Sequence, residues 1–264
     1  MGETGMADLV LLERDGAIAT VTLNRPERLN ALTLAMWEGV GEAMAALDAE
    51  EDIRCIVLRG AGGKAFAPGA DIAEFGTSRA NAEQGRVYGG VMHKTMKRID
   101  ECRHPTVALI EGICVGGGLE LAMLCDIRIC GESSRFGVPI NRIGVTMGYP
   151  EIAALIERVG RQVALEILLE GRVFGAEEAR EKRLVSRVVA DDKVVEEAYA
   201  AARRIAAGAP LVNRWHKKFA RRLADPTPLS PEEFNEPNLT FDTEDFRAGY
   251  QGFLTKKPPE FKGR

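Results

Sequence analysis

The chain has 264 residues, 45% of them hydrophobic, and a formal net charge of −4. This size and composition predict one large globular domain, or one domain with a small appendage, around a substantial core. The small acidic excess does not support a general nucleic-acid-binding surface, which needs an excess of Lys and Arg. No apolar run approaches the ~20 residues of a membrane span, and the first ten residues lack the pattern of a signal peptide.

The cysteines and histidines do not suggest a metal site. There is no CxxC motif among the cysteines, and the three histidines are isolated in the sequence, so we expect no zinc. Most of the cysteines lie in apolar segments, as small core residues do, and thiols without an evident pairing suit a reducing cytoplasm. The five are Cys55, Cys102, Cys114, Cys125 and Cys130.

The first third of the chain reads as strands followed by a helix. Residues 9–24 predict a β-hairpin with Asp15-Gly16 as its tight turn. A helix is expected from Thr33, a suitable N-cap, because apolar residues then recur at helical spacing. Residues 55–60 predict a short buried strand that leads into a Gly-rich loop over residues 61–70.

The middle of the chain repeats this alternation. A long helix is expected over residues 82–101, and strands over 106–110 and 127–130. Strands that alternate with helices indicate an α/β fold. Helical patterns dominate from about residue 150, and AAGAP, in a break near 200–210, could separate a helical appendage from the α/β body. We therefore expect a core over residues 1–205 and a helical C-terminal region over 206–264.

Two segments share one plan, namely strand, glycine loop and helix start. They are CIVLRGAGGKAFAPGADIAEF and TVALIEGICVGGGLELAM. Neither fits a phosphate-binding motif. In the first loop, Ala65 stands where a dinucleotide fingerprint needs its third glycine, and Leu58 stands where a P-loop needs its first. No GxSxG motif of an α/β-hydrolase occurs.

The paired loops suggest a different task. Backbone N–H groups at a helix start lack internal acceptors and attract negative charge, and glycine lets a carbonyl oxygen approach. Two such loops on neighbouring units could direct two N–H groups at one oxygen, as an oxyanion hole does. The alternative is that the glycines only allow strands and helices to pack tightly.

Glu120 is a carboxylate inside the apolar run that follows the second loop. Burial disfavours the charged form and raises the pKa of a carboxyl group, which suits a general acid or base near neutral pH. The alternative is an acidic residue that merely stabilises the first turn of a helix. Its position alone does not decide between the two.

Several motifs, in order along nearly the whole chain, resemble the crotonase family, the enoyl-CoA hydratases and isomerases. They are NRPERLNAL, KAFAPGADI, GICVGGGLELAMLCDIRIC, RFGVP, GRVFGAEEAREKRLVSRVV and EDFRAGYQGFLTKKPPEFKGR. The resemblance implies a spiral of ββα units with a helical C-terminal region, assembled as a homotrimer or a dimer of trimers. It implies an acyl-CoA thioester substrate in which coenzyme A arrives as part of the substrate, with no metal or redox cofactor.

The resemblance also implies roles for individual residues. The oxyanion donors would be the N–H groups of Ala70 and Gly117, and Glu120 would be an acid/base glutamate. Residues expected around the CoA thioester are Arg28, Leu29, Ala31, Ala67, Gly69, Asp71, Ile72, Gly116, Ile140, Phe253, Lys256 and Lys257. The last three of these could come from a neighbouring subunit. For Asp71 we expect a helix cap beside this site rather than a catalytic role, and for Asp126 a structural role.

One position departs from the family pattern. Family hydratases carry a second glutamate after the proline of an FGxPE motif, but here the stretch is FGVPI and the residue is Ile140. Hydration of a conjugated thioester shares its proton transfers between two carboxylates, whereas one carboxylate can move a proton and shift a double bond. Polar residues that could substitute are Asn141, Arg142, Tyr149 and Glu151, and Glu151 also suits the first turn of a helix after Pro150.

The sequence therefore predicts an acyl-CoA enzyme of the enoyl-CoA hydratase/isomerase type with one glutamate as acid/base. Decarboxylation or thioester hydrolysis in the same oxyanion hole is a second possibility. A catalytically weak CoA-binding or scaffold protein is a third, which Ile140 favours and Glu120 disfavours.

Overall fold

The structure is a computed structural model that describes residues 9–264. The expectation that the chain starts without a signal peptide concerns residues outside this range.

A six-stranded sheet forms the centre of the molecule, in the order β1-β2-β3-β5-β7-β10. The predicted hairpin is confirmed, because β1 and β2 pair antiparallel around Gly16, whose φ of 57° suits a tight turn. The remaining neighbours pair parallel. The strands are β1 (Val10–Asp15), β2 (Ile18–Leu23), β3 (Cys55–Gly60), β5 (Thr106–Ile110), β7 (Ile127–Gly131) and β10 (Arg187–Val189).

A second, smaller sheet has the order β4-β6-β8-β9. Its strands are β4 (Ala65–Ala67), β6 (Ile113–Val115), β8 (Arg135–Gly137) and β9 (Val173–Gly175). The chain thus passes three times from a long strand to a short one, through β3-β4, β5-β6 and β7-β8. The prediction that residues 61–70 are only a loop was wrong, because β4 lies within them. Three-residue strands are too short to show a period of two.

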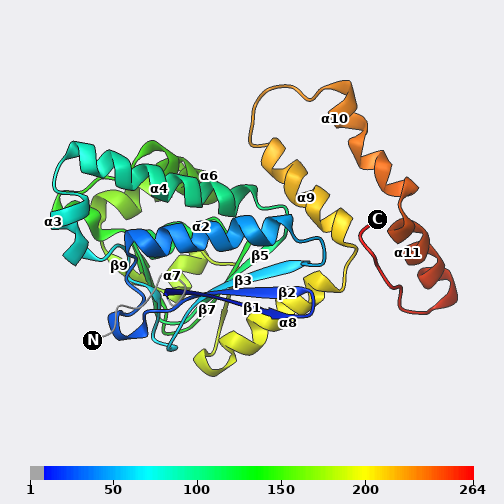
Figure 1. The fold of residues 1–264 in the computed structure, drawn as a ribbon, viewed down its shortest axis with the longest axis horizontal. Coiled ribbons are helices and arrows are strands. Elements are labelled where there is room, and N and C mark those ends of the chain that lie inside the picture. Colours follow the sequence, from blue (N-terminus) through cyan, green and yellow to red (C-terminus); the bar gives the residue numbers. More distant parts are fainter. Residues whose placement is uncertain (1–8) are drawn as a thin grey trace.

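Helices cover both faces of the large sheet (Figure 1). The helix α2 (Leu34–Ala49) packs against α4 (Ala82–Glu101), and α8 (Val194–Ala206) packs against β3 and β5 on the other side. The Thr33 hydroxyl accepts from the Met36 amide at 3.2 Å, as the predicted N-cap should. The main core lies between α2, α4 and the sheets, and a smaller core lies under α8.

Shorter helical segments connect these layers. The long helix α6 (Tyr149–Glu170) lies beside α5. The short segments are η1 (Pro26–Arg28), η2 (Ile72–Glu74), α3 (Phe75–Ser78), α5 (Gly117–Met123), η3 (Pro139–Ile143), α7 (Ala176–Glu181) and η4 (Asp191–Lys193).

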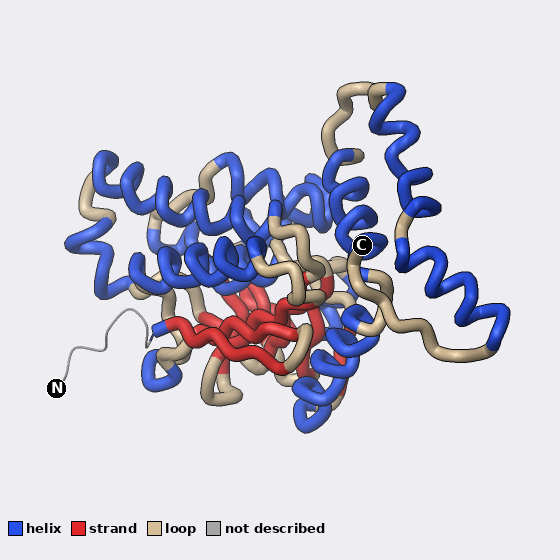
Figure 2. Tube along the Cα trace, turned by 45° about the vertical axis from the view of Figure 1, so that its right-hand side comes forward, coloured by secondary structure: helices blue, strands red, loops and turns tan. Residues whose placement is uncertain are grey.

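The last fifth of the chain leaves the body as a helical arm (Figures 1 and 2). After α8 ends at Ala206, the arm contains α9 (Pro210–Arg222), α10 (Pro231–Asn235), η5 (Glu236–Asp242) and α11 (Glu244–Thr255). Large apolar side chains of the arm are exposed, among them Phe234, Phe241 and Phe253.

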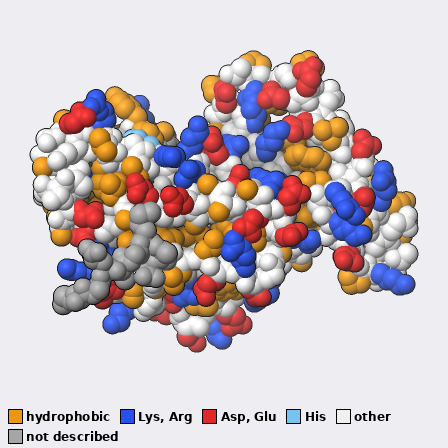
Figure 3. Space-filling view, viewed as in Figure 1, with side chains coloured by type: hydrophobic (Ala, Val, Ile, Leu, Met, Phe, Trp, Pro, Cys, Tyr) orange, Lys and Arg blue, Asp and Glu red, His pale blue; other side chains and the backbone are white. Residues whose placement is uncertain are grey.

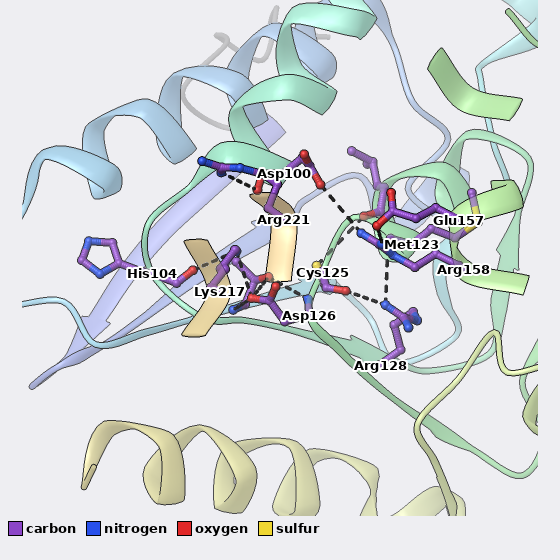
Figure 4. A network of polar contacts seen from close by, with 12 residues as sticks. Asp100, His104, Met123, Cys125, Asp126, Arg128, Glu157, Arg158, Lys217 and Arg221 are labelled. Atoms are coloured by element: carbon purple, nitrogen blue, oxygen red, sulfur yellow. Dashed lines mark hydrogen bonds and ion pairs between the residues drawn. The ribbon is translucent and has the colours of Figure 1, made fainter. Parts of the chain in front are cut away.

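Ion pairs and hydrogen bonds fasten α9 to the body (Figure 4). The Lys217 ammonium group lies 2.9 Å from the Asp126 carboxylate and donates to the His104 carbonyl at 3.1 Å. Asp126 also accepts from the Thr106 amide at 2.7 Å. Asp126 therefore joins β5, β7 and α9, which is the structural role predicted for it.

Charges of both signs are mixed on the face shown in Figure 3. In the described part of the chain, no helix is long and apolar enough to cross a membrane. All five cysteines are buried and unpaired, as expected for core residues.

Candidate active site

Two loops that follow neighbouring strands meet at one cavity. The strands β4 and β6 pair parallel, so the loops that follow them start at the same end of the small sheet, at the carboxyl ends of the strands. The cavity has a volume of about 190 Å³. Its walls include Ala70 from the first loop, Gly117 from the second, and Glu120 one turn further along α5. The structure thus brings together the three residues predicted to be catalytic.

The backbones of the two loops are in close contact. A Cβ atom placed on Gly69 would lie 3.4 Å from the Gly117 nitrogen, and one placed on Gly117 would lie 3.7 Å from the Ala70 nitrogen. Within the described part of the chain, neither the Ala70 nor the Gly117 N–H group donates to a protein acceptor. Two amide groups that lack an acceptor therefore lie close together at the wall of one cavity.

Glycine is required at two positions of the second loop for different reasons. Gly116 has φ 52° and ψ −124°, a conformation that residues with a side chain rarely adopt. A Cβ on Gly118 would lie 2.2 Å from the Ala67 carbonyl oxygen, so this glycine permits close packing of α5 on β4. The packing explanation considered for the loop is therefore correct for Gly118, whereas Gly117 borders the cavity.

We expect Gly118→Ala to lower the free energy of unfolding by about 1–3 kcal/mol, because the new methyl group would displace the backbone of β4. Gly90→Ala is a matched control, because it also lies in a helix, α4, and its Cβ would meet nothing within 4 Å. The free energy of unfolding of the control should rise by up to about 1 kcal/mol, because alanine has a higher helix propensity than glycine. Urea unfolding of both variants measures the difference, and equal effects would contradict the close contact.

Glu120 is 7% exposed and projects from the first turn of α5. Burial, with a smaller contribution from Glu151, raises the pKa of its carboxyl group to about 7, while Arg79 opposes the increase. No described group hydrogen-bonds to the Glu120 carboxyl oxygens, so they are available to a ligand in the cavity. Glu120 is therefore both a first-turn residue and a buried carboxyl group.

Arg79 is a member of the site that the sequence did not indicate. It lines the cavity, and its guanidinium carbon lies 3.5 Å from the centre of the Tyr88 ring. Its Nε atom is buried without a described partner. Arg79 follows the short helix α3, and only the packing of this segment against α4 brings it near Glu120. A single arginine in a polar stretch of sequence does not indicate such a position.

Asp71 caps a helix, as predicted. Its carboxylate accepts from the Ala73 amide at 3.0 Å and pairs with the Arg25 guanidinium at 2.6 Å. Arg25 in turn donates to the Ala31 carbonyl at 3.2 Å, which ties the turn at residues 29–31 to the loop after β4. The hydrogen bond from Arg25 is the main reason that the pKa of Asp71 lies below its usual value.

We expect Asp71→Asn to lower the free energy of unfolding by about 1–3 kcal/mol at pH 7, because it removes a charged hydrogen-bond acceptor but keeps a side chain that can cap. A depressed carboxyl pKa contributes stability at neutral pH that is lost as pH falls through the folded-state pKa. The difference between variant and wild type should therefore shrink toward pH 3. Urea unfolding at both pH values measures it, and a difference that does not depend on pH would contradict the ion pair.

The other residues expected around CoA lie in four places. Gly69, Ile72, Gly116 and Ile140 line the cavity. Ala67 is fully buried in β4, while Arg28, Leu29 and Ala31 belong to the neighbouring turn and do not line the cavity. Within one chain, Phe253, Lys256 and Lys257 lie on or just after α11 of the arm and do not reach the cavity. Their predicted role therefore needs a neighbouring subunit and stays a prediction.

The four polar residues that could replace the absent glutamate are now placed. Tyr149 is 93% exposed, Arg142 is exposed, and the Asn141 amide donates to the Leu169 carbonyl at 2.9 Å. Glu151 alone of the four lines the cavity, and it is 2% exposed. No three His, Cys, Asp or Glu side chains between residues 9 and 264 form a group that could hold a metal ion.

Comparison with known proteins identifies the family of the chain. A family model described as enoyl-CoA hydratase/isomerase matches residues 13–264. A crystal structure of an enoyl-CoA hydratase/carnithine racemase from Magnetospirillum magneticum superposes with a TM-score of 0.96 at 55% identity, covering 97% of this chain and 96% of that one. The chain therefore belongs to the enoyl-CoA hydratase/isomerase family. The predicted crotonase fold is confirmed.

Curated relatives also extend over the whole chain. A probable enoyl-CoA hydratase of Rhizobium meliloti is 36% identical over 260 residues, which cover 97% of this chain and 99% of the relative. A short-chain-enoyl-CoA hydratase of Clostridium acetobutylicum is 32% identical and covers 97% of this chain and 98% of the relative. The prediction that the chain is an enzyme of the hydratase/isomerase type is thereby supported as well.

Proposed function

We propose that the protein acts on 2-enoyl-CoA or 3-enoyl-CoA thioesters through a thioester enolate. The observation that carries the proposal is the pair of amide groups, on Ala70 and Gly117, that lack an acceptor at the cavity wall beside Glu120. Two such donors directed at one oxygen would stabilise the charge on an enolate without further reorganisation.

Glu120 would transfer the proton. A carboxyl group with a pKa of about 7 is divided between its acid and base forms at neutral pH, which is the condition for general acid–base catalysis. The thioester carbonyl would bind between the two amides, and Glu120 would exchange a proton with the acyl carbon chain. Coenzyme A would enter with the substrate, and the chemistry requires no metal or redox group.

The size of the cavity fits only part of such a substrate. Its volume of about 190 Å³ is below the roughly 300–1,000 Å³ typical of pockets for drug-sized ligands. The cavity would therefore enclose the acyl group and thioester, while the rest of CoA would lie outside along residues 28–31 and 67–72. The arm, with its exposed aromatic residues, suits contact with a second copy of the chain in a trimer or a dimer of trimers.

The experiment is to incubate the protein separately with crotonyl-CoA, a 3-enoyl-CoA and a malonyl-type CoA, and to identify the products. Hydration or double-bond migration supports the proposal. Release of carbon dioxide or free CoA would instead indicate decarboxylation or thioester hydrolysis. Binding without turnover of any thioester would indicate the scaffold alternative.

A further inference from the structure

A second buried carboxyl group lies in the wall of the cavity that contains Glu120. Glu151 is at the start of α6, and its side chain is 3% exposed. Its Oε2 atom is buried and has no hydrogen-bond partner among the described residues. An unpaired carboxylate oxygen inside a protein is costly, so a partner for Oε2 is expected when a ligand or water fills the cavity.

The other oxygen of the same group is held by a histidine. His93 Nε2, from α4, lies 3.0 Å from Glu151 Oε1. The His93 side chain is 37% exposed, so it connects the buried carboxyl group to solvent. Such a contact fixes the orientation of the carboxyl group and leaves Oε2 free for the cavity.

Two charged groups from other segments lie near this pair. Glu120 faces Glu151 from α5, and Arg79 faces Glu120 from the segment after α3, where it stacks on Tyr88 of α4. At the position where family hydratases carry their second glutamate, Ile140 presents only an apolar side chain to the cavity.

We propose that Glu151 is the second acid/base group of this enzyme and that His93 is its positioning residue. The inference rests on the proposed function and adds to it that the two-carboxylate reaction, hydration of a 2-enoyl thioester, is available although residue 140 is not acidic. The second carboxyl group would come from the start of α6 instead of from η3.

The reaction balances with these groups alone. One carboxylate takes a proton from water while the water oxygen bonds to C3. The C2=C3 π pair becomes the C1=C2 bond of the enolate, and the C=O π pair moves to the carbonyl oxygen. The other carboxyl group then gives its proton to C2, and the carbonyl forms again. The product has gained one water. The carboxyl group that took the proton from water then returns it to the carboxylate that gave its proton to C2, which restores the starting protonation state. The partly exposed His93 provides a route for this transfer through solvent.

The test measures hydration of crotonyl-CoA by loss of the conjugated-thioester absorbance. We expect Glu151→Gln to lower kcat by about 10²-fold or more, with the Kd for butyryl-CoA, which cannot be hydrated, changed less than threefold. Glu157→Gln is the matched control on the same helix, because its side chain is half exposed and pairs with Arg158; it should retain wild-type activity.

The outcomes separate this inference from the proposed function. If Glu120→Gln is inactive but Glu151→Gln keeps kcat within threefold, the inference is wrong and the proposed function stands. If the wild type isomerises a 3-enoyl-CoA but does not hydrate crotonyl-CoA, the inference is again wrong and the proposed function again stands. If the wild type turns over no enoyl-CoA, both are wrong.

The role of His93 has a separate readout. The active state needs one carboxyl group protonated and the other ionised, so kcat should fall on both sides of a pH optimum. Glu151→Gln should remove one limb of this profile of kcat against pH. We expect His93→Ala to lower kcat about tenfold without raising KM, and to shift that same limb along the pH axis. His93→Gln, which can still donate to Glu151, should recover most of the rate. Loss of thermal stability with an unchanged pH profile would overturn the positioning role.

Discussion

Replacing Glu120 with glutamine is expected to lower kcat by about 10²–10⁴-fold, the range for loss of a general acid or base. Glutamine has nearly the same shape but cannot exchange a proton, so affinity for an acyl-CoA should change little. The measurements are steady-state turnover of crotonyl-CoA and a 3-enoyl-CoA, together with calorimetric binding of butyryl-CoA. Glu132→Gln, an exposed change on the turn after β7, serves as the control. Turnover at the wild-type rate by the Glu120 variant would remove Glu120 from the mechanism.

The same variant should be more stable than the wild type at alkaline pH. The pKa of Glu120 is raised from 4.5 to about 7 in the folded protein, so ionisation favours the unfolded chain as pH rises between these values. The variant lacks this cost. We expect equal stability near pH 4 and an advantage for the variant on the order of 1–3 kcal/mol at pH 8. A variant less stable than the wild type at pH 8 would mean that the Glu120 carboxylate is well solvated in the protein.

Removing one amide hydrogen from the cavity wall is expected to reduce kcat by about 10²–10³-fold, the effect of losing one oxyanion donor. Incorporation of lactic acid in place of Ala70 exchanges the N–H group for an ester oxygen and keeps the methyl group. The donor acts on charge that develops during the reaction, so KM should change much less than kcat.

The control for this exchange is lactic acid in place of Ala73, three residues further on. The Ala73 amide donates to the Asp71 carboxylate and not to the cavity, so this ester should cost some stability but little activity. An ester at residue 70 also weakens the Gly69 carbonyl, which accepts from the Leu32 amide at 2.8 Å, and thermal unfolding of both esters measures that effect. Equal activity of the two esters would exclude Ala70 as an oxyanion donor.

The sequence was sufficient to predict the parts of the site that depend on local structure. The glycines at residues 116–118 and the acidic residue two positions later specify a tight loop, a helix start and a carboxyl group in an apolar run within five residues. The hairpin and the long helices were predicted for the same reason, since their patterns repeat over many residues. The short strands β4, β6 and β8 were missed because three residues show no period.

The remaining members of the site depend on packing between distant segments. Arg79, His93 and Glu151 come from the segment after α3, from α4 and from α6, and they meet only when those helices pack around α5. Glu151 was recognised as a first-turn residue after Pro150, and the structure agrees. Its burial and its contact with His93, 58 positions earlier, have no signature in the local sequence.

The five buried cysteines have a consequence for an enzyme that handles such substrates. A conjugated enoyl thioester is an electrophile that alkylates thiolates, so a thiol reacts when it is accessible and its pKa is not raised far above the ambient pH. Burial instead raises the pKa of Cys55, Cys125 and Cys130 to about 12 and that of Cys102 to about 11, and it raises that of Cys114 as well. The folded protein should therefore resist inactivation by its own reactive substrate, whereas the urea-unfolded chain should take up an alkylating label at five sites.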